Sequence, residues 1–246
     1  MTTATATMPR LSEPNSKLGS VWGWSIPAVK TCPGATSACM QSCYAKRGNF
    51  AFPKVMEFFA SNLEAAESPH FIDNMVSLIM AKGCRTFRIH ISGDFYSGEY
   101  IKKWTAIITA VNEKLGHRGE FCTFYFYTRS WRIPKLLPHI RTLGRLPHVH
   151  AWLSADRTSG TPPKVKWARV AYMSASDDES RQVAQNSLDS AKPDLIFRAC
   201  RKKAVLKKVG TVAVCPAENG QAKKVTCDMC RLCWKGFSSP RTQEKE

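Results

Sequence analysis

The chain has 246 residues, enough for one sizeable domain, and its 43% hydrophobic and 22% charged residues are ordinary for a globular protein with a core. No apolar run is long enough to span a bilayer, and the first residues lack the basic start and apolar block of a signal peptide. We therefore expect a cytoplasmic protein without a membrane anchor. The formal charge of +17 favours polyanionic partners such as nucleic acid, although the basic residues are scattered.

The first half of the chain alternates between strand-like and helical patterns. Residues 1–17 are rich in Thr, Ala, Ser and Pro and are expected to form a disordered tail, as are residues 238–246. A strand is predicted over 21–28, before a loop that contains three cysteines. Helices are predicted over 53–66 and from about residue 70, followed by a strand over 86–91 and an amphipathic helix over 100–115.

The second half continues this alternation. Strands are predicted over 121–127, 148–153, 167–173, 195–199 and 211–214, with a helix over 133–143, while the polar stretch 177–191 fits a helix or a loop. Repeated strand–helix units predict a parallel sheet, open or closed into a barrel. We expect an α/β fold over 18–210, a partial (β/α) barrel of about six parallel strands, with a cysteine-rich cluster-binding segment over 211–237.

Polar side chains recur where the predicted strands end. Parallel α/β folds bind ligands at the carboxyl ends of their strands, so this recurrence predicts a shared pocket. Each such residue alone is weak evidence, because any loop contains polar side chains. The pairs are His90 with Asp94, Thr128 with Arg129, Ser154 with Asp156, and Ser174 with Ser176.

The C-terminal cysteines form the sharper of two groups. Cys227, Cys230 and Cys233 follow one another at spacings of three, and Cys215 precedes them beside Pro216. Structural zinc commonly uses two separated cysteine pairs, whereas a triple run with a distant Cys-Pro is typical of [4Fe–4S] ferredoxins. The sequence therefore favours a fully ligated cluster here, with zinc as the alternative. Such a ligand set suits a reducing compartment better than disulfides do.

The front cysteines, Cys32, Cys39 and Cys43, lie in one loop with spacing Cys-x6-Cys-x3-Cys. Three thiolates leave a four-corner cluster with one open iron, unless a distant side chain such as His90 or Cys84 completes it. The isolated residues Cys84, Cys122 and Cys200 are otherwise expected to be small buried hydrophobic residues.

The sequence resembles the phage-encoded gene product 88 family, which is uncharacterised. The resemblance runs from about residue 24 to 234 and implies no activity. It would place the protein in the cytoplasm of a phage-infected cell. It is carried by Trp24-Ser25-Ile26-Pro27-Ala28, Cys43-Tyr44-Ala45, Ser92-Gly93-Asp94, Cys215-Pro216-Ala217 and Cys230-Arg231-x-Cys233-Trp234.

A second resemblance, in architecture, is to radical S-adenosylmethionine enzymes. In these enzymes a three-cysteine loop after the first strand of a partial barrel holds an open [4Fe–4S] cluster that binds the cofactor. The family spacing is Cys-x3-Cys-x2-Cys, shorter than the loop here. The resemblance implies that Asp94 contacts the cofactor's amino group and that the C-terminal cysteines hold an auxiliary cluster. Ser154 or Arg129 is expected to contact the cofactor's carboxylate, from their positions at strand ends alone.

The sequence thus predicts two [4Fe–4S] sites and, through the resemblance, S-adenosylmethionine and an electron donor as partners. The alternative is a nucleic-acid-binding protein with structural zinc or iron–sulfur sites, because the chain is basic and rich in Trp and Tyr, which can stack on bases.

Overall fold

The structure is a computed structural model that describes residues 7–185, 192–199, 208–209, 212–218 and 225–235. Its centre is one eight-stranded sheet, in which every pair of neighbouring strands is parallel except β7 with β8. From one edge to the other the order is β1 (Trp22–Ser25), β2 (Thr86–Ser92), β3 (Thr123–Thr128), β4 (Val149–Ala155), β5 (Ala168–Ser174), β6 (Leu195–Arg198), β8 (Val212–Val214) and β7 (Lys208–Val209).

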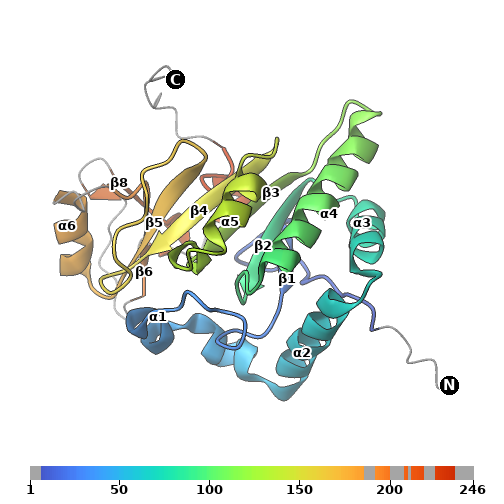
Figure 1. The fold of residues 1–246 in the computed structure, drawn as a ribbon. Helices are drawn as coiled ribbons and strands as arrows, with labels where there is room; N and C mark the ends of the chain where they lie inside the picture. The colour runs from blue at the N-terminus through green and yellow to red at the C-terminus, as the bar shows by residue number, and fades with distance from the viewer. Residues whose placement is uncertain (1–6, 186–191, 200–207, 210–211, 219–224, 236–246) are drawn as a thin grey trace.

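Three helices pack side by side on one face of this sheet (Figure 1): α3 (Phe71–Ala81), α4 (Gly98–Gly116) and α5 (Leu137–Gly144). The Ser97 hydroxyl caps α4 by accepting a hydrogen bond from the Tyr100 backbone N–H at 3.1 Å. The buried stripe of α4 has helical spacing, which turns one apolar face to the sheet. Its members are Tyr100, Ile101, Trp104, Ile107, Ile108 and Val111.

Side chains of β3 alternate between the two faces of the sheet, as the pleat of a strand requires. Phe124 and Phe126 pack in the main core beneath the helices. Tyr125 and Tyr127 contact residues of the C-terminal segment instead, including Trp234. The sheet is therefore buried on both faces, by helices on one side and by the C-terminal segment on the other.

The remaining elements surround the ends of the sheet. Helix α2 (Pro53–Glu67) precedes α3, and α6 (Asp177–Gln185) follows β5. The front loop contains α1 (Ser37–Ser42) and the short 3-10 helices η1 (Tyr44–Lys46) and η2 (Gly48–Ala51). The C-terminal segment contains η4 (Pro216–Glu218) and α7 (Cys227–Cys230), and η3 (Ser130–Arg132) follows β3. No helix among the described residues has the length and apolar character to cross a bilayer.

The mixed α/β class and the parallel pairing are confirmed, but the sheet has eight strands where about six were predicted. The sequence missed β7, a two-residue strand that pairs antiparallel with β8. The polar stretch after β5 is helical over α6, while residues 186–191 lie outside the described part. Helix α5 begins at Leu137, later than predicted, because η3 and a turn occupy the preceding residues.

Part of the expected N-terminal tail is packed against the domain. The side chain of Leu11 is buried, and Ser12 forms a β-bridge with Gly23 of β1. The Arg10 backbone N–H donates to Asn62 Oδ1 at 2.9 Å. An apolar side chain and local backbone pairing thus hold a segment whose composition alone predicts disorder. Residues 1–6 and the predicted tail 238–246 lie outside the described residues.

Candidate metal centres

The two cysteine groups lie in different places on the sheet. We call Cys32, Cys39 and Cys43 the front site and the remaining four, Cys215, Cys227, Cys230 and Cys233, the C-terminal site. The front site belongs to a loop that lies against the carboxyl ends of β3 and β4. The C-terminal site lies on the sheet face opposite α3–α5, against β3 and β4. The expected sets of three and of four cysteines therefore lie in two separate places on the sheet.

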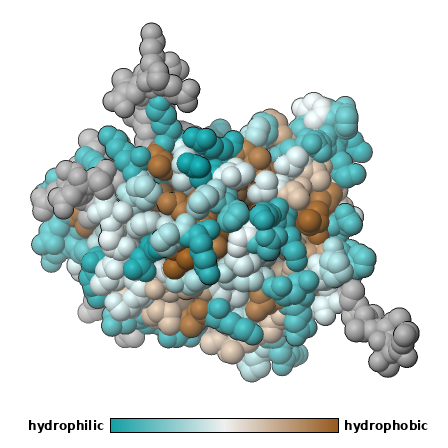
Figure 2. All heavy atoms as spheres, in the orientation of Figure 1, coloured by the Kyte–Doolittle hydropathy of each residue, from teal (hydrophilic) through white to brown (hydrophobic). Residues whose placement is uncertain are grey.

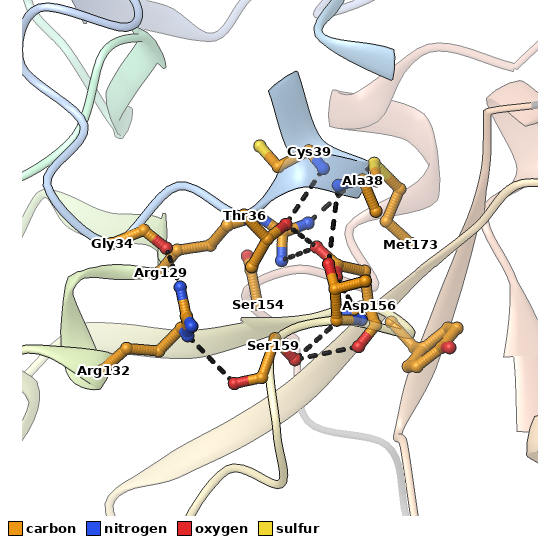
Figure 3. A network of polar contacts seen from close by, with 12 residues as sticks. Gly34, Thr36, Ala38, Cys39, Arg129, Arg132, Ser154, Asp156, Ser159 and Met173 are labelled. Atoms are coloured by element: carbon orange, nitrogen blue, oxygen red, sulfur yellow. Dashed lines mark hydrogen bonds and ion pairs between the residues drawn. The ribbon is translucent and has the colours of Figure 1, made fainter. Parts of the chain in front are cut away.

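Thr36 positions the middle cysteine of the front site. It is the N-cap of α1, and its hydroxyl accepts a hydrogen bond from the Cys39 backbone N–H at 2.9 Å. The same hydroxyl donates to Asp156 Oδ2 at 2.6 Å, just after β4 (Figure 3). One side chain therefore both starts the short helix and attaches it to the end of the sheet.

Asp156 joins this contact to the end of β3. Its carboxylate forms an ion pair with Arg129 Nη1 at 2.8 Å, and both side chains are almost fully buried (Figure 3). Burial acts to raise the pKa of Asp156, but the Thr36 hydroxyl and the Arg129 guanidinium outweigh it, so the pKa lies below its ordinary value. Asp156 is therefore held as a carboxylate. Removing either partner would leave a buried charge uncompensated.

A second attachment holds the loop at Gly34. Arg132 donates from Nη1 to the Gly34 carbonyl at 2.9 Å and from Nε to the Ser159 carbonyl at 2.9 Å (Figure 3). A Cβ at position 34 would lie only 2.1 Å from the Arg129 carbonyl oxygen. The loop therefore approaches the end of β3 so closely that only glycine fits.

Asp94 is buried at the end of β2 and already has three donors. Its Oδ1 accepts from the Phe95 backbone N–H at 2.7 Å and from the Thr128 hydroxyl at 2.7 Å, and Oδ2 accepts from the Arg129 backbone N–H at 2.8 Å. Burial raises the pKa of Asp94, and these hydrogen bonds act against that shift. Asp94 thus ties the end of β2 to the end of β3.

The predicted contacts Asp94, Arg129 and Ser154 all lie at the strand ends beneath the front loop. Asp94 and Arg129 are engaged within the protein, as described above. Ser154 is half-buried, and its backbone carbonyl accepts from the Trp131 indole N–H at 2.9 Å. The structure therefore brings the three residues to one edge of the sheet and gives two of them structural partners.

The thiols of the front site lie close enough to influence one another. Burial and then the nearby Asp94 carboxylate raise the pKa of Cys32 to about 12, and the Cys39 and Cys43 thiols add to this shift. Burial likewise raises the pKa of Cys43. Metal binding requires thiolates, so a metal would replace these protons and supply the positive charge that the desolvated sulfurs lack.

Neither of the side chains considered as a fourth ligand lies with the front thiols. His90 has a left-handed backbone (φ 62°) that turns its ring to the helix side of the sheet, where Nε2 is 3.0 Å from the Tyr100 hydroxyl. Burial lowers the pKa of His90 to about 3. Cys84 is buried before β2, at the opposite end of the strand, and its charge influences Cys122. Both residues belong to the core.

The four cysteines of the C-terminal site line one cavity. It encloses about 320 Å³ free of protein atoms, counting its opening to solvent. The rest of its lining is mainly apolar, from Leu195, Pro216, Ala217, Val225, Thr226 and Leu232. Burial raises the pKa values of Cys215 and Cys227, and raises that of Cys233 to about 11.

The segment that carries these cysteines is attached to the N-terminal segment as well as to the sheet. The Cys227 backbone N–H donates to the Lys17 carbonyl at 2.9 Å, and the Ser20 backbone N–H donates to Asp228 Oδ2 at 2.8 Å. On the sheet side, the Trp152 indole N–H and Arg169 both donate to the Cys233 carbonyl at 2.9 Å. The C-terminal site therefore links the two ends of the described chain.

Among the described residues, no three His, Cys, Asp or Glu side chains form a group that could hold a single metal ion. The C-terminal site nevertheless offers four thiols around one cavity, with the Tyr127 hydroxyl donating to the Cys233 sulfur at 2.8 Å. Sulfur ligands with such a donor suit a soft metal or an iron–sulfur cluster.

Several residues that shape these sites were not predicted from the sequence. Thr36 could have been found, because a threonine three residues before Cys39 matches the N-cap pattern of a short helix. Arg132 and Arg88 carry no local signal, since their partners lie far away in the chain. Tyr127 was predicted to lie in a strand, but its contact with Cys233 joins residues 106 positions apart.

The fold and the sites define a class: an α/β protein with a mostly parallel sheet and two separate cysteine groups. The chain matches the gene product 88 family over residues 2–236, and it belongs to that family. It is also 26% identical over 244 residues to the Gene 88 protein of Mycobacterium phage D29, covering 92% of this chain and 88% of that protein. No solved structure matches.

Proposed function

We propose that this protein binds two [4Fe–4S] clusters, one at the front site with an open iron and one at the C-terminal site with four cysteine ligands. The observation that carries the proposal is the cavity shared by Cys215, Cys227, Cys230 and Cys233. Cysteines from two separated segments line it together: Cys215 between β8 and η4, and the other three in α7 and the turn after it. The alternative is zinc at this site.

We extend the proposal to S-adenosylmethionine as the ligand of the front site. The consecutive order β1–β6, with α3–α5 on one face, is the order in which a (β/α) barrel is wound, and it supports the predicted partial barrel. When bound, an open iron–sulfur cluster supplies one electron to the sulfonium of this cofactor. The front loop has three cysteines, while His90 and Cys84 face the core.

The chain's own residues would bind and orient the cofactor at the strand ends. A carboxylate has about four acceptor positions, and three donors to Asp94 leave one for an amino group. Ser154 and Arg129 lie at the neighbouring strand ends and are the proposed contacts for the cofactor's carboxylate. Thr36, Asp156 and Arg132 would keep the front loop in place above them.

Anaerobic purification followed by iron, acid-labile sulfide and zinc analysis tests the clusters. We expect iron and sulfide approaching two cubanes per chain, whereas stoichiometric zinc without sulfide would contradict the proposal. The electron paramagnetic resonance spectrum of the reduced protein should change when S-adenosylmethionine is added. Ser154→Ala tests the contact more cleanly than Asp94→Ala, because Asp94 also holds Thr128 and Arg129.

A second candidate function, binding of single-stranded nucleic acid, is favoured by the surface around the front site. Residues 14–56 contain no Asp or Glu but five basic residues. Tyr44 and Phe52 are exposed here among Lys46, Arg47 and Lys54. Exposed aromatic rings next to cations suit bases and phosphates. The face of the molecule over α4 and α5 is mainly hydrophilic with isolated hydrophobic side chains (Figure 2).

Salt dependence of binding to a single-stranded oligonucleotide tests this candidate. Each phosphate contact contributes about 0.7 to the slope of log K against log salt for single strands. Lys46→Gln should therefore weaken binding and reduce the slope by about that amount. Lys102→Gln, which removes an exposed cation from α4, is the matched control and should change neither. Equal effects of the two variants would contradict a defined binding surface.

A further inference from the structure

The side chain of Tyr127 connects the sheet with the C-terminal site. It leaves β3 on the face opposite the helices, and its hydroxyl donates to the Cys233 sulfur at 2.8 Å. Its ring is stacked on Trp152 at 5.6 Å between centroids and lies edge-on to Phe197 at 5.3 Å. These contacts fix the direction of the hydroxyl, so the hydrogen bond does not depend on a freely rotating side chain.

Cys233, whose sulfur accepts the hydrogen bond from Tyr127, is also held in place by the sheet. The Cys233 carbonyl accepts from the Trp152 indole and from Arg169 Nη2, each at 2.9 Å. The guanidinium of Arg169 in turn stacks on the Trp152 ring, 4.0 Å from its centroid. Both the backbone and the sulfur of Cys233 are therefore held by residues of the sheet.

A half-buried cation, Arg88, lies over the Tyr127 ring. The guanidinium carbon of Arg88 is 5.5 Å from the ring centroid, and Nη2 donates to the Tyr44 hydroxyl at 3.4 Å. Several thiolates around one metal group carry a net negative charge, and a nearby cation offsets part of it.

We infer that Tyr127 is a positioning residue of the C-terminal site: its hydroxyl holds and stabilises the Cys233 thiolate in the metal-bound protein, with Arg88 supplying positive charge behind its ring. The inference rests on the proposed function, because it assigns a role toward the metal group of that site. Partners of metal ligands typically change metal affinity by about 10- to 100-fold when they are removed. Hydrogen bonds to ligand sulfurs also influence the reduction potential of iron–sulfur clusters.

Tyr125 provides a matched control from the same strand and the same face. Its hydroxyl is buried, and no hydrogen-bond partner for it is found among the described residues. Tyr127→Phe and Tyr125→Phe therefore remove the same atom from neighbouring tyrosines, but only the first removes a bond to a cysteine. Arg88→Gln is a second variant that removes the cation and leaves the Tyr127 hydroxyl in place.

The experiment uses the full-length chain with Cys39→Ala, so that only the C-terminal cluster contributes to the signal. We expect Tyr127→Phe to lose its cluster to a chelator about 10-fold faster than the parent. Its reduction potential, followed by electron paramagnetic resonance, should be lower, because a donor to the more negative reduced form is gone. Arg88→Gln should shift the potential in the same direction, and Tyr125→Phe should match the parent.

Equal chelator rates and potentials for Tyr127→Phe and Tyr125→Phe, with clusters present in both, would overturn the inference alone. A parent protein that binds zinc without sulfide would overturn the cluster proposal instead. In that case competition for zinc tests the hydrogen bond directly, and a 10-fold or greater loss of affinity in Tyr127→Phe, but not in Tyr125→Phe, would still support the role of Tyr127. If the parent binds zinc without sulfide and Tyr127→Phe leaves the zinc affinity unchanged, both the cluster proposal and the role of Tyr127 are overturned.

Discussion

The front site and the C-terminal site are held by different kinds of contact. The front loop is attached to the strand ends by hydrogen bonds, from Thr36 to Asp156 and from Arg132 to the Gly34 carbonyl, and an ion pair with Arg129 holds Asp156 in place. The C-terminal segment packs against aromatic side chains of the sheet, and Tyr127 and Trp152 contact Cys233 itself. The first arrangement positions a loop, and the second positions a ligand atom.

This difference indicates how the two sites divide their roles. The front loop has three cysteines and borders the strand ends where α/β folds bind ligands. The C-terminal site has four cysteines and joins the N-terminal segment to the sheet through Cys227 and Asp228. Under the proposed function, we therefore expect metal at the front site to serve chiefly reactivity and metal at the C-terminal site to serve chiefly stability.

The largest expected effect is the loss of metal from the C-terminal site. A ligand present at about 1,000 times its dissociation constant stabilises the folded state by about 4 kcal/mol. Cys230→Ser removes one of four ligands, so it should lower the free energy of unfolding of the loaded protein by about that amount. Cys39→Ala should cause a smaller loss, because the front loop keeps its Thr36 and Arg132 attachments. Urea unfolding under anaerobic conditions measures both.

Chelator treatment is the control for this comparison. Once metal has been removed, the parent and Cys230→Ser should unfold at the same urea concentration, because the variant changes only metal binding. A Cys230→Ser protein that keeps full metal content and parental stability would contradict a structural role. A larger loss of stability for Cys39→Ala than for Cys230→Ser would reverse the proposed division between the sites.

An intermediate effect is expected where the front loop touches the sheet most closely. A Cβ in Gly34→Ala would lie 2.1 Å from the Arg129 carbonyl oxygen, so the loop or the strand end must move. Overpacking of this kind costs about 1–3 kcal/mol. Alkylation of Cys39 in the metal-free protein should also become faster, because the loop is displaced. Mass spectrometry of the alkylated peptides measures this rate.

Gly116→Ala is the matched substitution at the end of α4. No heavy atom lies within 4 Å of a Cβ built there, so this variant should be as stable as the parent or slightly more stable. Cys39 should react at the parental rate in it. If Gly34→Ala behaves like Gly116→Ala, the close approach of the loop to β3 does not hold it in place.

Local patterns predicted the elements better than their assembly. The strands β2–β6 and the helices α2–α4 follow from apolar periodicity, which depends only on neighbouring residues. The run from Cys227 to Cys233 and the three front cysteines are likewise local patterns. Strand β7 was missed because two residues show no periodicity, and it pairs only because β8 lies beside it.

The partners of the site residues could not be predicted, because their contacts join distant parts of the chain. Thr36 and Asp156 are 120 positions apart, and Asn62 binds the backbone of Arg10 and Ser25. Asp94 was predicted as a ligand contact at a strand end. Its position is confirmed by the structure, but its three internal donors depend on how β2 and β3 are placed side by side.

The smallest expected effect is on stability at acidic pH, and each region has a carboxylate that should contribute to it. Hydrogen bonds from Thr226 and from the Ser20 backbone lower the pKa of Asp228 to about 2, from an ordinary value of 3.8. The pKa of Asp156 is also lowered, as described above. A carboxylate whose pKa is lower in the folded state stabilises it above the unfolded pKa, and this stabilisation is lost as the pH falls through the folded pKa.

Unfolding between pH 5 and pH 2 should therefore distinguish the two regions. Between pH 5 and pH 2, Asp156→Asn and Asp228→Asn should each lose less stability than the parent loses, because each variant lacks one titrating group. The contribution of Asp228 should be the smaller of the two, since this carboxylate is only half-buried and Asp156 is buried. Cysteine alkylation in metal-free protein at pH 7 locates each effect. Asp156→Asn should expose Cys39 and leave Cys227 unchanged, because Asp156 accepts from Thr36, the cap of the helix that carries Cys39. Asp228→Asn should do the reverse, because Asp228 ties the segment of Cys227 to Ser20. If either variant exposed both cysteines equally, the two sites would belong to one cooperative unit, and the contrast between a positioned loop and a positioned ligand would not hold.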